Sequence, residues 1–301
     1  MSFPPCSSSD EESLLKRRLR PWLKVPLPAG PNYRNVQRLL DEASLHTVCQ
    51  EAHCPNAGDC WEHGTATFLI LGSICTRGCR YCAVAQGTPK PLDLDEPERV
   101  AEVAGKLGLH YVVVTSVTRD DLPDGGASMF ARTILAVRRR LADCRVEVLV
   151  PDFGGSEEAL RFVLDAQPDV LNHNIEVARS LFSEVRPRGD YDISLGLLSN
   201  AKRLCANCVT KSGFMVGLGE TRDEVLTTMR DLRRVGCDLL TIGQYLSPSN
   251  AHHPVARFYK PEEFEVLRQE AQSLGFTGVV AAPLVRSSYH AGEQHALLRH
   301  V

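Results

Sequence analysis

The chain has 301 residues, of which 43% are hydrophobic and 24% charged, and its formal net charge is −3. These values are typical of a globular protein with one large α/β domain or two small ones, and nothing in them points to nucleic acid or an anionic membrane as a partner. No apolar run approaches the roughly 20 residues that span a bilayer. The acidic start, Asp10 to Glu12, fits neither a secretory nor a transit peptide. We therefore expect a cytoplasmic protein.

The first 30 or so residues form an extension. Four prolines between residues 21 and 31 exclude a long helix there. The next segment, Arg34 to Ala43, is expected to be a short helix that leads into a cluster of cysteines.

From residue 66 onward, apolar strands alternate with amphipathic helices. The alternation predicts a parallel sheet covered by helices on its outer side. Thr221 and Glu224 form a capping box, and Pro261 fits the first position of a helix. Both a doubly wound sheet and a barrel place polar ligand-binding residues after the strands, so the pattern leaves both open. Strands are expected at residues 67–71, 111–114, 146–150, 169–171, 214–216, 239–242 and 279–280.

Six of the eleven cysteines lie close together in the sequence and form two sets of three. In a chain without secretory features, such tight spacing favours metal binding over disulfides. Zinc is one alternative, but no fourth His or Cys follows the second set at the usual distance. A [4Fe–4S] cube usually takes four thiolates, so a set of three leaves one iron free to bind a substrate, a cofactor or another protein group. The sets are Cys49, Cys54 and Cys60 (C-x4-C-x5-C) and Cys75, Cys79 and Cys82 (C-x3-C-x2-C).

The second set, with Tyr81 before its last cysteine, resembles the signature of the radical SAM superfamily. The resemblance implies a partial or full (β/α) barrel. It also implies that S-adenosylmethionine chelates the open iron and is cleaved reductively to a 5′-deoxyadenosyl radical.

Three further motifs narrow the resemblance to the lipoyl synthase family over about residues 22–290. They are the first cysteine set, the segment from Trp22 to Pro26, and the run Arg286, Ser287, Ser288 and Tyr289. The family implies a partial (β/α)6-type barrel over residues 66–275. An N-terminal extension, residues 1–65, would carry the auxiliary cysteines, and a C-terminal extension, residues 276–301, would carry the serines.

The family also implies two [4Fe–4S] clusters with different tasks. Cys75, Cys79 and Cys82 would hold the cluster that binds S-adenosylmethionine. The upstream cysteines, with Ser288 as fourth ligand and Ser287 as the alternative, would hold an auxiliary cluster that gives up its sulfide. The implied reaction inserts two sulfur atoms, at C6 and C8 of an octanoyl chain in amide linkage to a lysine of a carrier protein.

Several partners follow from this resemblance. They are an octanoylated lipoyl carrier domain or glycine cleavage H protein, an electron donor such as ferredoxin or flavodoxin, and an iron–sulfur carrier protein. A basic N-terminal segment, formed by Lys16, Arg17, Arg18 and Arg20, could attract an acidic carrier or simply be a solvated end.

Polar or glycine residues after the predicted strands are candidates for binding S-adenosylmethionine, each with a structural alternative such as a tight turn or a surface side chain. Family resemblance suggests donors to the amino acid end of the cofactor. Position at a strand end suggests contacts to its ribose or methionine, and guanidinium geometry suggests a bidentate arginine for its carboxylate. The resemblance also suggests glycines that let the backbone approach adenine. In that order they are Thr115 and Ser116; Asn174 and Glu176; Arg188; and Gly217 and Gly219.

Two other functions are compatible with parts of the pattern. A different radical SAM enzyme, such as a methylthiotransferase or a biotin-synthase-like sulfur inserter, would not explain the first cysteine set or the Arg-Ser-Ser-Tyr run. An electron carrier or metal-dependent regulator would normally complete both clusters with cysteine. The pair Cys205 and Cys208 has no place in any of these patterns.

Overall fold

The computed structural model describes residues 20–25, 30–62 and 67–296. Its main feature is one eight-stranded sheet in which neighbours along the chain are neighbours in space. A doubly wound sheet reverses its strand order partway, so this sequential order selects the barrel-type winding. The order is β1 (His46–Thr47), β2 (Thr67–Ile70), β5 (Tyr111–Ser116), β6 (Arg145–Leu149), β7 (Val170–Asn172), β8 (Val209–Val216), β9 (Leu239–Gln244) and β10 (Gly278–Ala282).

All strands of this sheet run parallel except β1, which pairs antiparallel with β2. The sheet is open, because β1 and β10 are its two edges. The expectation of a partial barrel is thereby confirmed. One strand from each expected extension joins the sheet, whereas the boundaries set at residues 65 and 275 stay predictions.

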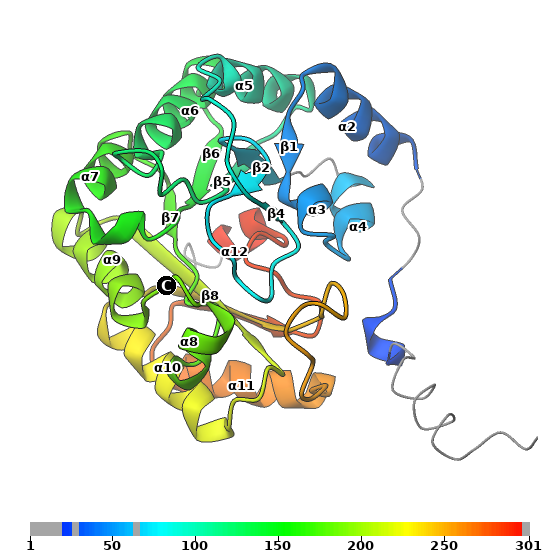
Figure 1. Cartoon of the computed structure of the whole chain (residues 1–301), viewed down its shortest axis with the longest axis vertical. Coiled ribbons are helices and arrows are strands. Elements are labelled where there is room, and N and C mark those ends of the chain that lie inside the picture. The colour runs from blue at the N-terminus through cyan, green and yellow to red at the C-terminus, as the bar shows by residue number, and fades with distance from the viewer. Residues whose placement is uncertain (1–19, 26–29, 63–66, 297–301) are drawn as a thin grey trace, which may run out of the picture.

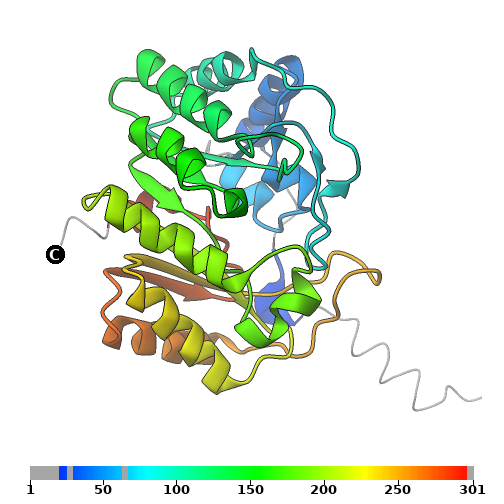
Figure 2. The same cartoon turned by 60° about the vertical axis from the view of Figure 1, so that its left-hand side comes forward.

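One long helix follows each of the six strands from β2 to β9, and together these helices form the outer layer of the curved sheet (Figure 1). Turning the molecule shows the helices stacked along the outside of the strands (Figure 2). These helices are α5 (Glu96–Lys106), α6 (Ala127–Arg140), α7 (Glu157–Asp165), α9 (Tyr191–Leu204), α10 (Arg222–Arg234) and α11 (Pro261–Ser273).

Shorter elements connect this frame or extend it at both ends. They are η1 (Pro21–Leu23), α2 (Pro31–Glu42), α3 (Val48–Glu51), α4 (Ala57–Glu62), β3 (Ile74–Cys75), β4 (Ala85–Gln86), η2 (Phe153–Gly155), η3 (Arg179–Leu181), α8 (Phe182–Val185) and α12 (Ala291–Ala296). The basic residues Lys16 to Arg18 lie outside the described residues.

The apolar residues that repeat along the predicted helices form the core between the sheet and the outer helices. Phe130, Ile134 and Val137 of α6 are fully buried. The predicted capping box is confirmed, since the Thr221 hydroxyl accepts from the Glu224 amide and the Glu224 carboxylate accepts from the Thr221 amide. Such a cap contributes about 1 kcal/mol to helix stability.

Strand β8 begins five residues earlier than the sequence predicts. The apolar pattern missed its first half because that half contains a buried charged residue, Lys211. The Lys211 ammonium lies 2.9 Å from a carboxylate oxygen of Glu147, and both side chains are sealed from solvent. Asn172 and Tyr111 donate to the same carboxylate, at 3.0 and 2.7 Å. With these partners the strand tolerates a lysine, whereas an unpaired buried charge would be costly.

This polar cluster of Tyr111, Glu147, Asn172 and Lys211 lies inside the barrel. Tyr111, Glu147 and Lys211 each stand two or four residues before a residue that lines the central cavity on the same strand, and alternate residues of a strand share a face. Asn172, the last residue of β7, stands two residues before Asn174, which also lines the cavity. Below the cluster, α12 contacts both β5 and β10, so the C-terminal segment crosses the amino-terminal end of the barrel.

Among the helices that the structure describes, none combines the length and apolar composition that crossing a bilayer requires.

Candidate active site

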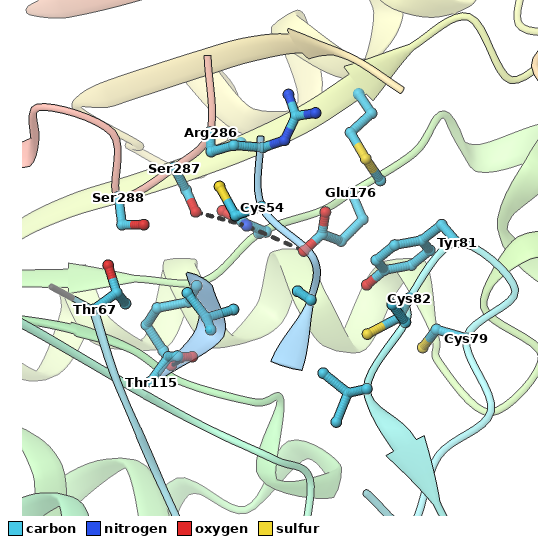
Figure 3. Close-up of a pocket in the computed structure, with 18 of the residues that line it drawn as sticks. Cys54, Thr67, Cys79, Tyr81, Cys82, Thr115, Glu176, Arg286, Ser287 and Ser288 are labelled. Atoms are coloured by element: carbon cyan, nitrogen blue, oxygen red, sulfur yellow. Dashed lines mark hydrogen bonds between the residues drawn. The ribbon is translucent and has the colours of Figure 1, made fainter. Parts of the chain in front are cut away.

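A cavity of about 510 Å³ opens at the carboxyl ends of the strands, inside the curve of the sheet. Residues of β2, β5, β8 and β9 line it, as does the C-terminal segment from Val285 to Tyr289. All six clustered cysteines line the same cavity as free thiols. Figure 3 shows Cys79 and Cys82 on one side of this space and Ser287 and Ser288 on the other. The two cysteine sets, which come from different segments of the chain, thus line one cavity.

The loop that carries Cys75, Cys79 and Cys82 follows β2, as predicted, and is tied down by a buried arginine. Arg77 lies between two of these cysteines and is only 8% exposed. Its guanidinium contacts Asp152 at 2.6 Å and Asp120 at 2.8 Å. These carboxylates follow β6 and β5, so the loop is anchored to two strand ends at once.

Cys49, Cys54 and Cys60 approach the cavity from the N-terminal extension. Cys49 lies on α3 and Cys60 on α4, with Cys54 in the connection between them. The adjacent Trp61 is 1% exposed and packs against Tyr33, with ring centroids 4.9 Å apart. Aromatic packing of this kind fixes the short helix that presents Cys60.

Burial raises the pKa of most of these thiols above the ordinary value. The pKa of Cys49 is raised to about 11, and those of Cys60 and Cys82 to about 12, chiefly by desolvation. Desolvation also raises the pKa of Cys79 and Cys54, and nearby arginines, Arg186 and Arg286, oppose the rise. Without metal these five thiols are therefore neutral at pH 7, and metal binding must displace their protons.

No three His, Cys, Asp or Glu side chains among the described residues converge closely enough to hold a single metal ion. An iron–sulfur cube differs from a single ion in that each thiolate binds a different iron, so its ligands stand further apart.

The two serines of the C-terminal segment have different surroundings. The Ser287 hydroxyl accepts a hydrogen bond from the Asn174 side-chain amide at 3.2 Å. Ser288 also lines the cavity, and within the described part of the chain its hydroxyl has no hydrogen-bond partner. Ser288 is therefore the serine whose oxygen is available to an incoming group.

Four of the residues predicted to bind S-adenosylmethionine do line the cavity: Thr115, Ser116, Asn174 and Glu176. Within the described residues, the Ser116 hydroxyl and the Asn174 side-chain carbonyl are buried without a hydrogen-bond partner. Buried polar atoms are normally paired, so two such atoms on residues that line one cavity point to a polar ligand there. The residues present thus fit a cofactor with several hydrogen-bonding groups.

Glu176 is held in an unusual conformation between the two cysteine sets. Its φ of +69° is in the left-handed region, which non-glycine residues rarely adopt. Its backbone amide donates to Gly213 and its carboxylate accepts from Asn174 at 3.1 Å. Burial raises its pKa and the neighbouring Arg186 opposes the rise. The strain indicates that the fold holds this carboxylate at a required position.

Arg188, Gly217 and Gly219 lie outside the cavity lining. Arg188 is exposed and donates to the Thr76 carbonyl at 2.6 Å, so it braces the loop of the second cysteine set. The amides of Gly217 and Gly219 donate to the Glu220 carboxylate. A Cβ at Gly217 would overlap Gln244 and the Arg257 carbonyl, so this glycine permits close backbone packing.

Sequence reasoning missed three arginines that the fold brings to the site. Arg77 and Arg186 are buried, and Arg286 lines the cavity near Glu176 (Figure 3). Arg77 could have been found, since its position between two predicted ligands predicts proximity to the cluster. Cys205 and Cys208 do not line the cavity and form a turn at the end of α9.

Comparison with protein families gives two matches. Residues 69–232 match the radical SAM superfamily, and residues 7–54 match the N-terminal domain of lipoyl synthase of the radical SAM family. The lipoyl synthase of Roseiflexus sp. is 55% identical over 287 residues, which cover 95% of each chain. The lipoyl synthase of Rubrobacter xylanophilus is 55% identical over 91% of this chain and 85% of its own.

Solved structures of other proteins share the fold. Methylornithine synthase (PylB) has a TM-score of 0.55 and 13% identity, covering 89% of this chain and 79% of its own. HydG, a maturase of the [FeFe]-hydrogenase, has a TM-score of 0.58 and 17% identity, covering 76% and 54%. With the paired cysteine sets in one cavity and relatives that match nearly end to end, this chain belongs to the lipoyl synthase family of the radical SAM superfamily.

Proposed function

We propose that this cavity is the active site in which the chain inserts two sulfur atoms into an octanoyl group, at C6 and C8, to give a lipoyl group. The observation that carries the assignment is the meeting of two three-cysteine sets and a serine around one space. The reaction needs both a strong hydrogen-abstracting agent and a sulfur source close to the same carbon. A single cavity lined by both sets meets that need.

The cofactors of this family are S-adenosylmethionine and two [4Fe–4S] clusters. When bound, they supply a carbon-centred radical that removes hydrogen and sulfide for the new C–S bonds. Cys75, Cys79 and Cys82 hold the first cluster in our proposal and leave one of its irons for S-adenosylmethionine. The ion pairs of Arg77 with Asp120 and Asp152 hold this loop in place while the substrate enters.

Cys49, Cys54, Cys60 and Ser288 hold the auxiliary cluster in our proposal. The choice of Ser288 over Ser287 is supported by the hydrogen bond that engages Ser287 with Asn174. A hard oxygen ligand suits a soft thiolate-rich iron site less well than sulfur does. Ser288 is therefore the ligand that would leave when the auxiliary cluster is dismantled.

Thr115, Ser116, Asn174 and Glu176 bind S-adenosylmethionine in our proposal. The unpartnered Ser116 hydroxyl and Asn174 carbonyl offer hydrogen bonds to its polar groups. Tyr81 is placed to cover the bound cofactor, since it precedes Cys82 and lines the same cavity. Arg186 and Glu176 provide opposite charges nearby for its carboxylate and amino groups.

The substrate arrives on a lipoyl carrier protein, so an acyl-lysine arm must reach into the cavity while a folded domain docks outside. We propose that the carrier is a lipoyl domain or the glycine cleavage H protein, and that a ferredoxin or flavodoxin donates electrons. An iron–sulfur carrier protein rebuilds the auxiliary cluster. Deletion of residues 1–20 tests the basic segment: unchanged carrier affinity and salt dependence would refute its docking role.

Anaerobic reconstitution of iron and sulfide tests the cluster assignment. Two four-iron cubes predict about eight irons per chain, falling to about four when either cysteine set is changed to alanine. Product analysis on an octanoylated carrier then tests the reaction. Zinc in anaerobically purified protein, or four irons in the unaltered chain, would contradict the proposal.

A further inference from the structure

The two ends of the open barrel meet at the auxiliary cysteines. The N-terminal cysteine segment follows β1, which is one edge of the sheet, and the serine segment follows β10, which is the other edge. In the described part of the chain no strand pairing joins these two edges. Side-chain contacts must therefore hold the two segments together.

Among the described residues, three side-chain contacts link the segments at two places, one buried and one exposed. Asn56 is 4% exposed and donates from its side-chain amide to the Leu284 carbonyl at 2.7 Å. On the exposed side, the Asp59 carboxylate accepts from the Tyr289 hydroxyl at 3.1 Å and lies 3.4 Å from the His290 ring. Together these contacts, which we name the clasp, span residues 228 to 231 positions apart.

The clasp brackets the proposed ligands of the auxiliary cluster. Asn56 lies between Cys54 and Cys60, and Asp59 directly precedes Cys60. On the other segment, Tyr289 directly follows Ser288. Each end of the clasp is thus within a few residues of a ligand, and none of its members has been assigned to the cluster itself.

We propose that the clasp positions Ser288 beside the auxiliary cysteines whether or not the cluster is present, so that the site stays assembled while the cluster is taken apart and rebuilt. The inference rests on the proposed function, because it takes Ser288 as the fourth ligand. The reason is physical: a serine oxygen binds a thiolate-rich iron site too weakly to hold a whole segment in place.

The loss of each contact should have a different effect. Without the Asn56 amide, the Leu284 carbonyl would be left unpaired in a buried place, which is costlier than losing an exposed bond. Asp59 is partly exposed, so its removal should loosen the segment without unfolding the barrel. Asp59→Ala and Tyr289→Phe are therefore the informative variants.

Hydrogen–deuterium exchange on the protein without iron tests the clasp directly. The backbone amides of Val285 and Tyr289 are hydrogen-bonded to Ala282 and Arg286 and serve as reporters. Asp59→Ala should speed their exchange by about fivefold to tenfold, the effect of losing about one hydrogen bond. Unchanged exchange in Asp59→Ala and in Tyr289→Phe would overturn the proposal.

Glu51→Ala is the matched control. It removes an acid of the same extension whose carboxylate lies 3.0 Å from the His46 ring and which makes no described contact with the C-terminal segment. This variant should leave the exchange of residues 284–290 unchanged, so a general loosening of the extension would be recognised.

A second measurement separates positioning from the identity of the ligand. Mössbauer spectra would be recorded on protein that lacks Cys75, Cys79 and Cys82, and hence carries only the auxiliary cluster. Asp59→Ala should reduce the fraction of clusters with one distinct, oxygen-ligated iron while iron stays near four, and Asp59→Glu should restore it. If Ser288→Ala leaves the spectrum unchanged, the ligand assignment fails, whereas the exchange data still decide whether the clasp exists.

Discussion

The side-chain amide nitrogen of Asn174 lies 3.2 Å from the hydroxyl oxygen of Ser287, although 113 positions separate the two residues. The same nitrogen donates to Glu176 at 3.1 Å. A proposed ligand of S-adenosylmethionine is thereby joined to the segment that carries the proposed fourth ligand of the auxiliary cluster. The two halves of the active site share a hydrogen bond.

Asn174→Ala should weaken binding of S-adenosylmethionine about tenfold, because it removes one direct contact and frees the Glu176 carboxylate to turn. Calorimetric titration of the reconstituted enzyme would measure the change. Ser287→Ala is the control, since it keeps the bond between Asn174 and Glu176, and it should bind the cofactor with nearly the original affinity. Equal affinities in all three proteins would contradict the role of Asn174.

Ser288→Cys should retain the auxiliary cluster but lower the yield of lipoyl product per enzyme, because a fourth thiolate would hold the cluster too firmly for it to release sulfide. Product per chain in a single round on an octanoylated carrier is the measurement. Ser287→Cys offers a matched change one residue away, and it should have a smaller effect. Unaltered yield in Ser288→Cys would remove the argument for a labile oxygen ligand.

The contact between Arg77 and Asp152 should make folding stability sensitive to acid. Burial raises the pKa of Asp152, but hydrogen bonds from Arg77 outweigh it and hold the pKa at about 2. A depressed carboxyl pKa contributes stability that is present above about pH 4 and is lost as pH falls toward 2. The difference amounts to about 2 kcal/mol.

Guanidinium unfolding of the iron-free protein at pH 5 and pH 3 would measure about half of this loss, about 1 kcal/mol, because Asp152 is still mostly ionised in the folded protein at pH 3. Asp152→Asn should remove that part of the pH dependence. Asp192→Asn is the comparison, because the Asp192 carboxylate pairs with Arg179 at the surface and exposed pairs contribute little. A pH dependence that is the same in Asp152→Asn as in the original chain would contradict the prediction.

Gly243 provides the space in which the C-terminal segment crosses the barrel. A Cβ at this position would overlap the Val285 carbonyl oxygen and lie 3.2 Å from the Arg286 guanidinium. Gly243→Ala should therefore displace the serine segment and reduce the iron held by the auxiliary set, with a loss of about 1–3 kcal/mol in stability. Gly196→Ala, in α9 with nothing within 4 Å, should instead stabilise by about 0.5–1 kcal/mol. Iron counts and thermal unfolding would measure both, and full auxiliary iron in Gly243→Ala would contradict the first.

The sequence predicted the alternation of strands and helices because their apolar residues repeat with different periods. It missed the first half of β8, since the pairing that buries Lys211 depends on Glu147, a residue 64 positions earlier. Periodicity predicts which residues are buried, but it does not predict which strands are neighbours in the sheet. The strand order therefore came from the family resemblance and from the structure.

At the site, the cysteine spacing predicted two metal centres, and strand ends predicted Thr115, Ser116, Asn174 and Glu176 as cavity residues. For Arg188 the sequence left a cofactor ligand and a surface arginine open, because two arginines flank Pro187 and spacing does not tell which one turns inward. It is Arg186 that lies against the cavity, and Arg188 that braces the loop. The sequence could not predict the contacts of Asp59 with Tyr289 and His290, because these residues come from the opposite end of the chain. Lys211 and its distant partner Glu147 were missed for the same reason.

The buried pair of Glu147 and Lys211, with α12 beneath it, fills the barrel below the cavity. An acyl arm that enters at the carboxyl ends of the strands therefore meets a blind end and has to withdraw by the path it came. With that end filled by described residues, a half-sulfurated arm and a finished one leave by the opening through which they entered. How long the carrier stays docked at that opening, and not any internal exit, would then decide whether the second sulfur is added before release.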